Sequence, residues 1–311
     1  MIELRGLTKR YGDRVAVDDL TCGIEAGRVT GFLGPNGAGK STTMRMILGL
    51  DRPTAGSALV GGRRYQDLRH PLREVGALLD ARAVHPARSA RAHLLSMARS
   101  NGIAASRVDE VLETVGLTGA AGRRAGSFSL GMGQRLGIAG ALLGDPGVLM
   151  FDEPVNGLDP DGVRWVRELV RSLAAEGRTV FVSSHLMSEM QLTADRLVVI
   201  GKGRLIADAP LQEVIAGSSL TAVRVRSPHA ADLCEWLVSA GLDVRRPAEN
   251  ELIVTGGTIE RVGDIAHQAG ARLHELSPRE ASLEQAYQEL TASSREYDAS
   301  VPVLTTPETR V

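Results

Sequence analysis

The chain has 311 residues, with 36 Lys and Arg against 37 Asp and Glu and a formal net charge of −1. This length fits one large domain or two moderate ones, and a near-neutral chain has no surplus of cations for gripping nucleic acid. The longest uncharged apolar stretch, residues 136–144, is far shorter than the roughly 20 residues of a membrane-spanning helix. Charges within residues 1–5 argue against a signal peptide. The two cysteines, Cys22 and Cys234, lie too far apart for a motif, and we expect them in a reducing compartment. Taken together, these features predict a soluble, cytosolic protein.

Short apolar or β-branched runs alternate with helical patterns over the first two thirds of the chain, which predicts an α/β protein. The expected strands are residues 29–33, 148–151, 179–183 and 196–200. Each of the first three runs into a polar or glycine-containing stretch that opens a helix. Open parallel sheets place their ligands at this edge, beyond the carboxyl ends of the strands. Between the first two strands, residues 67–144 read mainly as helix.

The pattern changes after Gly217, where a strand, a helix, two strands, a helix and a strand are expected in turn, over residues 223–226, 233–240, 242–246, 251–255, 259–269 and 271–276. This β-α-β-β-α-β order is typical of a ferredoxin-like module. Residues 277–280 have the Ser, Pro and Glu of a helix start, and they predict a last helix that carries Leu283 and Ala286. We therefore expect a large α/β domain, an accessory module and a disordered tail, at residues 1–217, 220–291 and 292–311.

A glycine-rich loop follows the first expected strand. It fits the pattern G-x-x-x-x-G-K-[ST] with the residues Gly34, Pro35, Asn36, Gly37, Ala38, Gly39, Lys40 and Ser41. Glycines let backbone N–H groups curl around phosphate oxygens, and the helix that follows directs its N-terminal dipole at the anion. Lys40 would supply a point charge to the β- and γ-phosphates, and Ser41 a hydroxyl ligand for Mg²⁺. The loop therefore predicts a nucleotide site rather than an ordinary glycine-rich turn.

Two acidic residues stand at the carboxyl end of the second expected strand. In P-loop nucleotide hydrolases the first such acid, here Asp152, holds Mg²⁺, and the adjacent Glu153 can orient or deprotonate the attacking water. Alone, the pair could equally end an ordinary strand, but together with the glycine-rich loop it indicates hydrolysis. His185 follows the next strand. A lone histidine is more often structural, but this one is expected at the same sheet edge.

The segment 128–135, which reads FSLGMGQR, resembles the L-S-G-G-Q signature of the nucleotide-binding subunits of ATP-binding cassette (ABC) transporters. The other motifs follow in the order of that family, and the resemblance covers about residues 2–217. It implies that two cassettes pair head to tail, with Ser129 and Gly131 of one contacting the γ-phosphate held by the other. Ser129 suits this role because it opens a helix, where a hydroxyl and free N–H groups form an anion site.

Other roles come from the same resemblance. Tyr11 resembles the aromatic residue that stacks on adenine, and Thr42 adjoins the phosphate loop as part of the nucleotide site. Asp159 lies in a segment that resembles the loop linking the two sites of the dimer, and His185 resembles the histidine that senses the γ-phosphate.

The chain also departs from the family pattern. Asp80 stands where glutamine is usual, and it is expected to meet Mg²⁺ or its water as an anion. Leu130 and Met132 replace the usual glycine and glutamine of the signature. Both features resemble the ATPases of bacterial drug and antibiotic-resistance exporters of the daunorubicin and bacitracin types, which also carry a C-terminal extension.

The resemblance thus implies a P-loop NTPase core of the ABC type with helical and antiparallel β subdomains. The expected activity is hydrolysis of ATP with Mg²⁺, powering export of a drug or antibiotic through a separately encoded membrane permease. We expect a homodimer, peripheral on the cytoplasmic side of the membrane, with no nucleic acid as partner. The alternatives are a soluble ABC ATPase without a pore and the ATPase of an importer.

Overall fold

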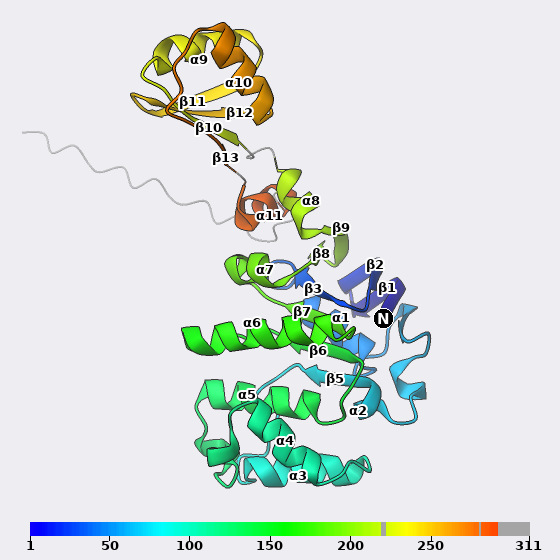
Figure 1. The fold of residues 1–311 in the computed structure, drawn as a ribbon. Coiled ribbons are helices and arrows are strands. Elements are labelled where there is room, and N and C mark those ends of the chain that lie inside the picture. The colour runs from blue at the N-terminus through cyan, green and yellow to red at the C-terminus, as the bar shows by residue number, and fades with distance from the viewer. Residues whose placement is uncertain (219–221, 280, 292–311) are drawn as a thin grey trace, which may run out of the picture.

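The computed structural model describes residues 1–218, 222–279 and 281–291. The tail expected at residues 292–311 and Glu280 of the expected helix start lie outside the described residues. Figure 1 shows a larger α/β body that contains the N-terminus and a smaller unit of helices and strands at the opposite end. In the part of the chain that is described, no helix is both long and apolar enough to cross a membrane.

A six-stranded sheet runs through the centre of the larger body. Its order is β5 (Val75–Leu78), β6 (Val148–Asp152), β7 (Thr179–Ser183), β3 (Arg28–Leu33), β8 (Arg196–Gly201) and β9 (Arg204–Pro210). Neighbouring strands are parallel except for β8 and β9, which are antiparallel. The strands expected at residues 29–33, 148–151, 179–183 and 196–200 are confirmed, and their apolar runs are buried as in sheets covered on both faces.

Strand β5 was not predicted, because residues 67–144 read mainly as helix. It pairs with β6 in parallel, with Val75 opposite Val148 and Leu78 opposite Phe151. A buried run of four apolar residues has no period that separates a strand from a turn of helix. Pairing with β6 decides the conformation of this segment, and it extends the sheet toward the helical region.

A second, three-stranded antiparallel sheet has the order β2 (Arg14–Ile24), β1 (Ile2–Tyr11) and β4 (Ala55–Val60). Together with helix α1 (Lys40–Ile47) it packs on one face of the central sheet. Buried residues of both sheets and of the helix form one cluster that includes Leu20, Phe32, Met44, Ile47 and Phe181. The ring centres of Phe32 and Phe181 lie 4.9 Å apart. This packing fixes α1 at the end of β3.

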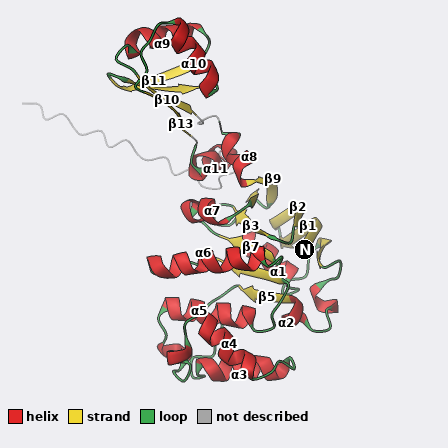
Figure 2. Cartoon of the chain, viewed as in Figure 1, coloured by secondary structure: helices red, strands yellow, loops and turns green. Residues whose placement is uncertain are grey.

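Helices cover the other face and extend beyond it, as Figure 2 shows. Helix α2 (Pro71–Glu74), just before β5, and the 3-10 turn at Tyr65–Asp67, which packs through Tyr65 against the first core, are not among them. The helices on this face are α3 (Ala90–Ser100), α4 (Ser106–Thr114), α5 (Leu130–Leu142), α6 (Pro160–Ala175) and α7 (Met187–Thr193), with 3-10 turns at Thr118–Ala120 and Ala125–Ser127. Their apolar faces share a core with the central sheet, which includes Leu94, Leu112, Leu142 and Val170. The helical region is thus packed onto the sheet through α5 and α6.

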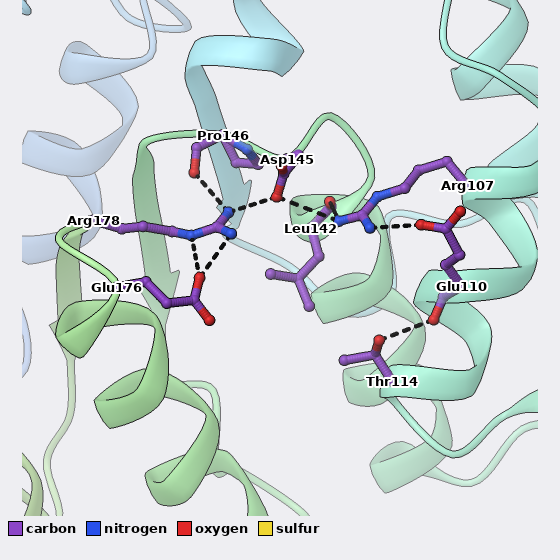
Figure 3. Close-up of polar contacts among 8 residues, drawn as sticks. All are labelled: Arg107, Glu110, Thr114, Leu142, Asp145, Pro146, Glu176 and Arg178. Atoms are coloured by element: carbon purple, nitrogen blue, oxygen red, sulfur yellow. Dashed lines mark hydrogen bonds and ion pairs between the residues drawn. The ribbon is translucent and has the colours of Figure 1, made fainter.

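Asp145 connects α4 to the strands, as Figure 3 shows. Its carboxylate accepts a 2.8 Å hydrogen bond from Arg178 just before β7, and it lies 3.5 Å from a guanidinium nitrogen of Arg107 on α4. Arg178 also pairs with Glu176, and Arg107 pairs with Glu110. One carboxylate in the turn between α5 and β6 therefore joins two basic side chains from separate parts of the body.

The smaller unit is formed by β10 (Ala222–Arg226), α9 (Ala230–Ser239), β11 (Asp243–Ala248), β12 (Glu251–Thr255), α10 (Ile259–Gln268) and β13 (Glu275–Arg279). The strands form an antiparallel sheet in the order β11-β12-β10-β13. Val225, Leu233, Leu252 and Val262 belong to a core of its own beneath α9 and α10. The β-α-β-β-α-β element order agrees with the sequence pattern.

The helix expected to begin at Ser277 is wrong. Ser277 and Pro278 belong to β13, where they pair with Arg224 and Val223 of β10. Proline is tolerated there because β13 is an edge strand, and an edge strand has backbone groups that need no partner. Helix α11 begins only at Leu283, after Ser282.

The start of α11 is a capping box. The hydroxyl of Ser282 accepts a 3.2 Å hydrogen bond from the backbone N–H of Gln285, whose side chain accepts from the backbone N–H of Ser282 at 3.0 Å. The module expected at residues 220–291 included this helix. Leu283 and Ala286, however, are buried in the core of the larger body, with α7 and α8 (Leu211–Ala216) as its neighbours. The chain thus returns from the smaller unit to the body.

Candidate nucleotide-binding site

The glycine-rich loop lies between β3 and α1, at the carboxyl edge of the central sheet. Gly37 and Gly39 have φ values of +81° and +104°, which side chains with a Cβ rarely adopt. A Cβ on Gly39 would also lie 2.4 Å from the carbonyl oxygen of Ala16 in β2. Strand β2 therefore packs so closely against the loop that there is no room for a side chain at Gly39. Glycine is required where the backbone turns into the helix.

Lys40 is the first residue of α1 and its side chain is almost fully buried. The ammonium group donates hydrogen bonds to the carbonyl oxygens of Gly34, at 2.6 Å, and Pro35, at 3.3 Å. Burial lowers the pKa of Lys40, while the nearby carboxylates of Glu153 and Asp152 act in the opposite direction. The loop thus encloses the positive charge of Lys40.

Ser41 and Asp152 meet at the next position of the site. The hydroxyl of Ser41 donates a 2.7 Å hydrogen bond to one carboxylate oxygen of Asp152, and the hydroxyl of Ser183 bonds to the other. Ser183, the last residue of β7, was not identified from the sequence as a site residue. Its position opposite Asp152 in the parallel register of β6 and β7 brings it there.

Glu153 follows directly and faces His185. One carboxylate oxygen of Glu153 lies 2.7 Å from Nδ1 of His185, whose backbone N–H donates to the same oxygen at 3.4 Å. The backbone of Glu153 has a φ of +51°, in the left-handed region. Sequence reasoning placed both residues at one sheet edge, and the structure brings their side chains into contact.

A cavity of about 610 Å³ opens beside Lys40, Asp152 and Glu153, with a volume in the range of small-molecule sites, and His185 and Ser183 are not part of its lining. Its lining includes the expected residues Tyr11, Asn36, Gly37, Ala38, Gly39, Lys40, Ser41, Thr42, Asp152 and Glu153. Arg14, Ala16 and Leu79 also line it and were not predicted. The position of Arg14 after the Tyr11 turn was the only signal in the sequence that could have suggested it.

Tyr11 lines this cavity, and the residue is 49% exposed. Its hydroxyl donates a 3.0 Å hydrogen bond to Asp51, and the ammonium of Lys9 lies 4.9 Å from the ring centre. The hydroxyl is thus anchored, while about half of the residue's surface stays open to solvent. A flat ligand could stack on such a ring.

The signature residues lie elsewhere. Ser129 caps the N-terminus of α5, where its hydroxyl accepts a 3.2 Å hydrogen bond from the backbone N–H of Met132. Gly131 lies close to Gly157, and Asp159 caps α6 by accepting from Gly162 at 2.9 Å. None of Ser129, Gly131 and Asp159 lines the cavity above Lys40.

Asp80 is likewise outside the lining of that cavity. It follows β5 and is exposed, and its carboxylate accepts a 2.8 Å hydrogen bond from the backbone N–H of Arg82. Its position adjoins Leu79, which does line the cavity. Asp80 thus lies in the chain between the cavity-lining Leu79 and the helices that begin with α3.

A buried lysine in a glycine-rich loop, a serine bonded to an aspartate and a glutamate bonded to a histidine define a P-loop ATPase. Residues 17–156 match the ABC transporter family. The chain is 42% identical to the bacitracin transport ATP-binding protein BcrA of Bacillus licheniformis, over 69% of this chain and 71% of that protein. It is 38% identical to the lantibiotic transport ATP-binding protein SrtF of Streptococcus pyogenes, over 67% and 90%. The chain belongs to the ATP-binding proteins of ABC transporters.

The solved structure of an ATP-binding subunit of an ABC transporter shows the same fold. It has a TM-score of 0.64 at 26% identity and covers 70% of this chain and 92% of that one. Residues 221–284 match a second family, described as a domain of unknown function (DUF8746). The resemblance to exporter ATPases of the bacitracin type is confirmed, and the enzyme is an ATP-hydrolysing cassette.

Proposed function

We propose that this ATPase powers the export of a peptide-type antibiotic or a related drug through a separate membrane permease. The relatives named for bacitracin and lantibiotic transport support this assignment, since they are 42% and 38% identical to this chain over 69% and 67% of its length. The observation that carries the proposal is the contact of Glu153 with His185 beside the buried Lys40. This contact supports a role for Glu153 as the base and for His185 as the group that senses the γ-phosphate.

Magnesium fits the oxygen groups of Ser41 and Asp152. A hydroxyl and a carboxylate 2.7 Å apart are hard ligands, and Mg²⁺ bound with nucleotide usually takes only one or two protein ligands, with water and phosphates supplying the rest. When bound, the ion would neutralise charge that develops on the phosphates. The role of Ser183 is to hold the Asp152 carboxylate in place, through its hydroxyl.

Glu153 is proposed as the general base. Glu153 lines the cavity above Lys40, and a carboxylate there can accept a proton from an attacking water. His185 holds one of its oxygens and thereby fixes the side chain. Tyr11 is proposed to stack on adenine and Thr42 to bind phosphate, since both line the same cavity.

We infer a homodimer from the separation of the two halves of the site. The anion site expected at Ser129 and Gly131 does not line the cavity that holds Lys40 in the same chain. A second cassette in head-to-tail orientation would bring its own Ser129 to that cavity, and Asp159, beside the signature helix, would lie at the junction. The dimer would bind two ATP molecules between its subunits.

The remaining assignments concern the partner. Asp80 is proposed to transmit the state of the nucleotide to the permease, because it lies between Leu79 of the cavity and the helical region. A peripheral position on the cytoplasmic face of the membrane follows from that partnership. We also propose a ferredoxin-like module at residues 222–279, supported by its element order and strand order, with an accessory role in assembly.

The test is co-expression of this chain with a candidate permease from the adjacent reading frame, followed by reconstitution in vesicles. ATP-driven movement of bacitracin or a lantibiotic, lost in Glu153→Gln, would support the proposal. Uptake in the opposite orientation would favour an importer. ATPase activity that no permease stimulates would favour an ABC ATPase without a pore.

A further inference from the structure

We propose that Gln134 is a positioning residue for Glu153, and that it connects the catalytic carboxylate to the helix that begins at Ser129. The inference rests on the proposed function, in which Glu153 is the general base. It assigns a role to a residue of the signature segment that does not line the nucleotide cavity.

The first observation is the backbone of Glu153. Its φ of +51° lies in the left-handed region, which is uncommon for residues other than glycine, asparagine and aspartate. Such a conformation persists only where the surroundings hold it, and it is found preferentially at functional sites. The question is therefore which groups hold Glu153.

Both sides of the residue are held by side chains from other elements. The backbone N–H of Glu153 donates a 3.0 Å hydrogen bond to the hydroxyl of Ser183 on β7. Its carbonyl oxygen accepts a 2.8 Å hydrogen bond from the side-chain amide of Gln134 on α5, and a 3.2 Å bond from the backbone N–H of Asn156. The two peptide planes around Glu153 are thus fixed, and with them the direction of its side chain toward His185.

Gln134 is suited to this task because it is only 4% exposed. A buried amide that loses its acceptor leaves an unsatisfied donor, so the contact with the carbonyl of Glu153 is strongly preferred. The helix around it is tightly packed, with Leu136 and Ile138 fully buried. Gln134 therefore moves with α5 and not independently of it.

The same helix begins at Ser129, only about one and a half turns before Gln134. A short stretch of helix is stiff, so a displacement at its N-terminus reaches Gln134. An ATP held by a second cassette and contacted by Ser129 would then fix the position of α5. Through Gln134, α5 would in turn fix the position of Glu153. Hydrolysis in one cavity would in this way depend on nucleotide at the other.

Three variants test the role. Gln134→Met keeps the volume but removes the donor, and it should lower kcat about 10- to 100-fold while the Kd for ATP stays within about threefold, as expected when a reacting group is displaced by up to an ångström. Gln134→Glu keeps the shape, but only its protonated form can donate. Burial raises the pKa of a carboxyl group, so lowering the pH from 8 to 6 should increase the protonated fraction of the introduced carboxyl group. The kcat of Gln134→Glu, relative to that of the unchanged chain, should therefore rise as the pH is lowered from 8 to 6. Ile138→Val, buried on the same helix, should leave kcat unchanged.

The inference is overturned if Gln134→Met keeps its kcat, if it changes only KM, or if Gln134→Met and Gln134→Glu are equally impaired at every pH. Should Gln134→Met fail to fold, the comparison of Gln134→Glu with the unchanged chain across pH decides the matter in one folded preparation. Glu153→Gln, measured alongside, distinguishes failure of the proposed base from failure of the role of Gln134. If Glu153→Gln hydrolyses ATP normally, the proposed base is wrong; if it is inactive while Gln134→Met is normal, only the role of Gln134 fails.

Discussion

The hydroxyl of Ser41 donates a 2.7 Å hydrogen bond to the carboxylate of Asp152, although 111 positions separate them in the chain. Ser41 lies in the first turn of α1 and Asp152 ends β6. Strand β7 lies between β6 and β3, which leads into the phosphate loop. The strand order alone therefore brings the two proposed magnesium ligands together.

Lys40→Met should abolish productive nucleotide binding. The variant keeps the aliphatic stem but removes the charge, and each charge-assisted hydrogen bond is worth about 1.5–3 kcal/mol, so ATP affinity should fall by roughly 10- to 100-fold or more. Isothermal titration calorimetry with MgATP measures this. Lys202→Met, on an exposed residue that does not line the cavity, is the control. An unchanged Kd for Lys40→Met would contradict the phosphate site.

Glu153→Gln should lower ATP hydrolysis by about 10²–10⁴-fold, because the amide keeps the shape but lacks the basic oxygen. Since ATP binding remains, saturating ATP should trap two chains as a stable dimer. Light scattering during gel filtration measures the mass, and phosphate release measures hydrolysis. Glu168→Gln, on the exposed side of α6, should behave like the unchanged chain. A Glu153→Gln chain that stays monomeric in ATP, with and without its permease, would count against the proposed head-to-tail dimer.

Asp80→Ala should affect coupling more than nucleotide affinity. The residue follows β5 and bonds to Arg82 outside the cavity, so ATP affinity should change by no more than a few fold. Stimulation of ATP turnover by the permease should fall. Turnover with and without permease, in vesicles, measures the ratio. If affinity collapses while stimulation survives, Asp80 is a binding residue.

Two variants of Asp145 separate the contribution of its charge to stability from that of its backbone conformation. The ion pairs shown in Figure 3 are exposed on the carboxylate side, where such pairs are worth about 0–1 kcal/mol, so Asp145→Asn should cost no more than that in the free energy of unfolding. Asp145 also has a φ of +52°, which asparagine tolerates and alanine does not. Asp145→Ala should therefore cost about 1–2 kcal/mol more. Urea denaturation measures both, and equal losses would show that the backbone conformation contributes little.

Removal of the chain after Gly217 should leave ATP affinity intact, because no residue of the later part lines the nucleotide cavity among the residues described. It also removes α11, and with it the buried side chains of Leu283 and Ala286 next to α7. A lower melting temperature and poorer co-purification of the permease are expected. A second chain that joins Gly217 to Ala281 and keeps α11 should recover the melting temperature but not the assembly. Loss of ATP binding in a folded truncated chain would place part of the site in the module.

Local chemistry made much of the site predictable. The phosphate loop is a contiguous pattern in which Gly39 must turn, Lys40 must carry charge and Ser41 must begin a helix, so each residue type has a reason that neighbours in the sequence supply. The same holds for Asp152, which follows a run of apolar residues, and for the capping of α5 by Ser129. The error at Ser277 has the same origin, because Ser-Pro is a valid helix start locally and only pairing with β10 makes it a strand.

The sequence by itself determined the loop, the acidic pair and the four strands that carry them, since short-range periodicity and turn chemistry fix these. The tertiary structure alone decided which distant groups meet. Ser183 reaches Asp152 through the register of β6 and β7, Gln134 reaches Glu153 from a separate helix, and α11 returns to α7. Those contacts depend on strand order and on the packing of buried faces, which no local pattern specifies.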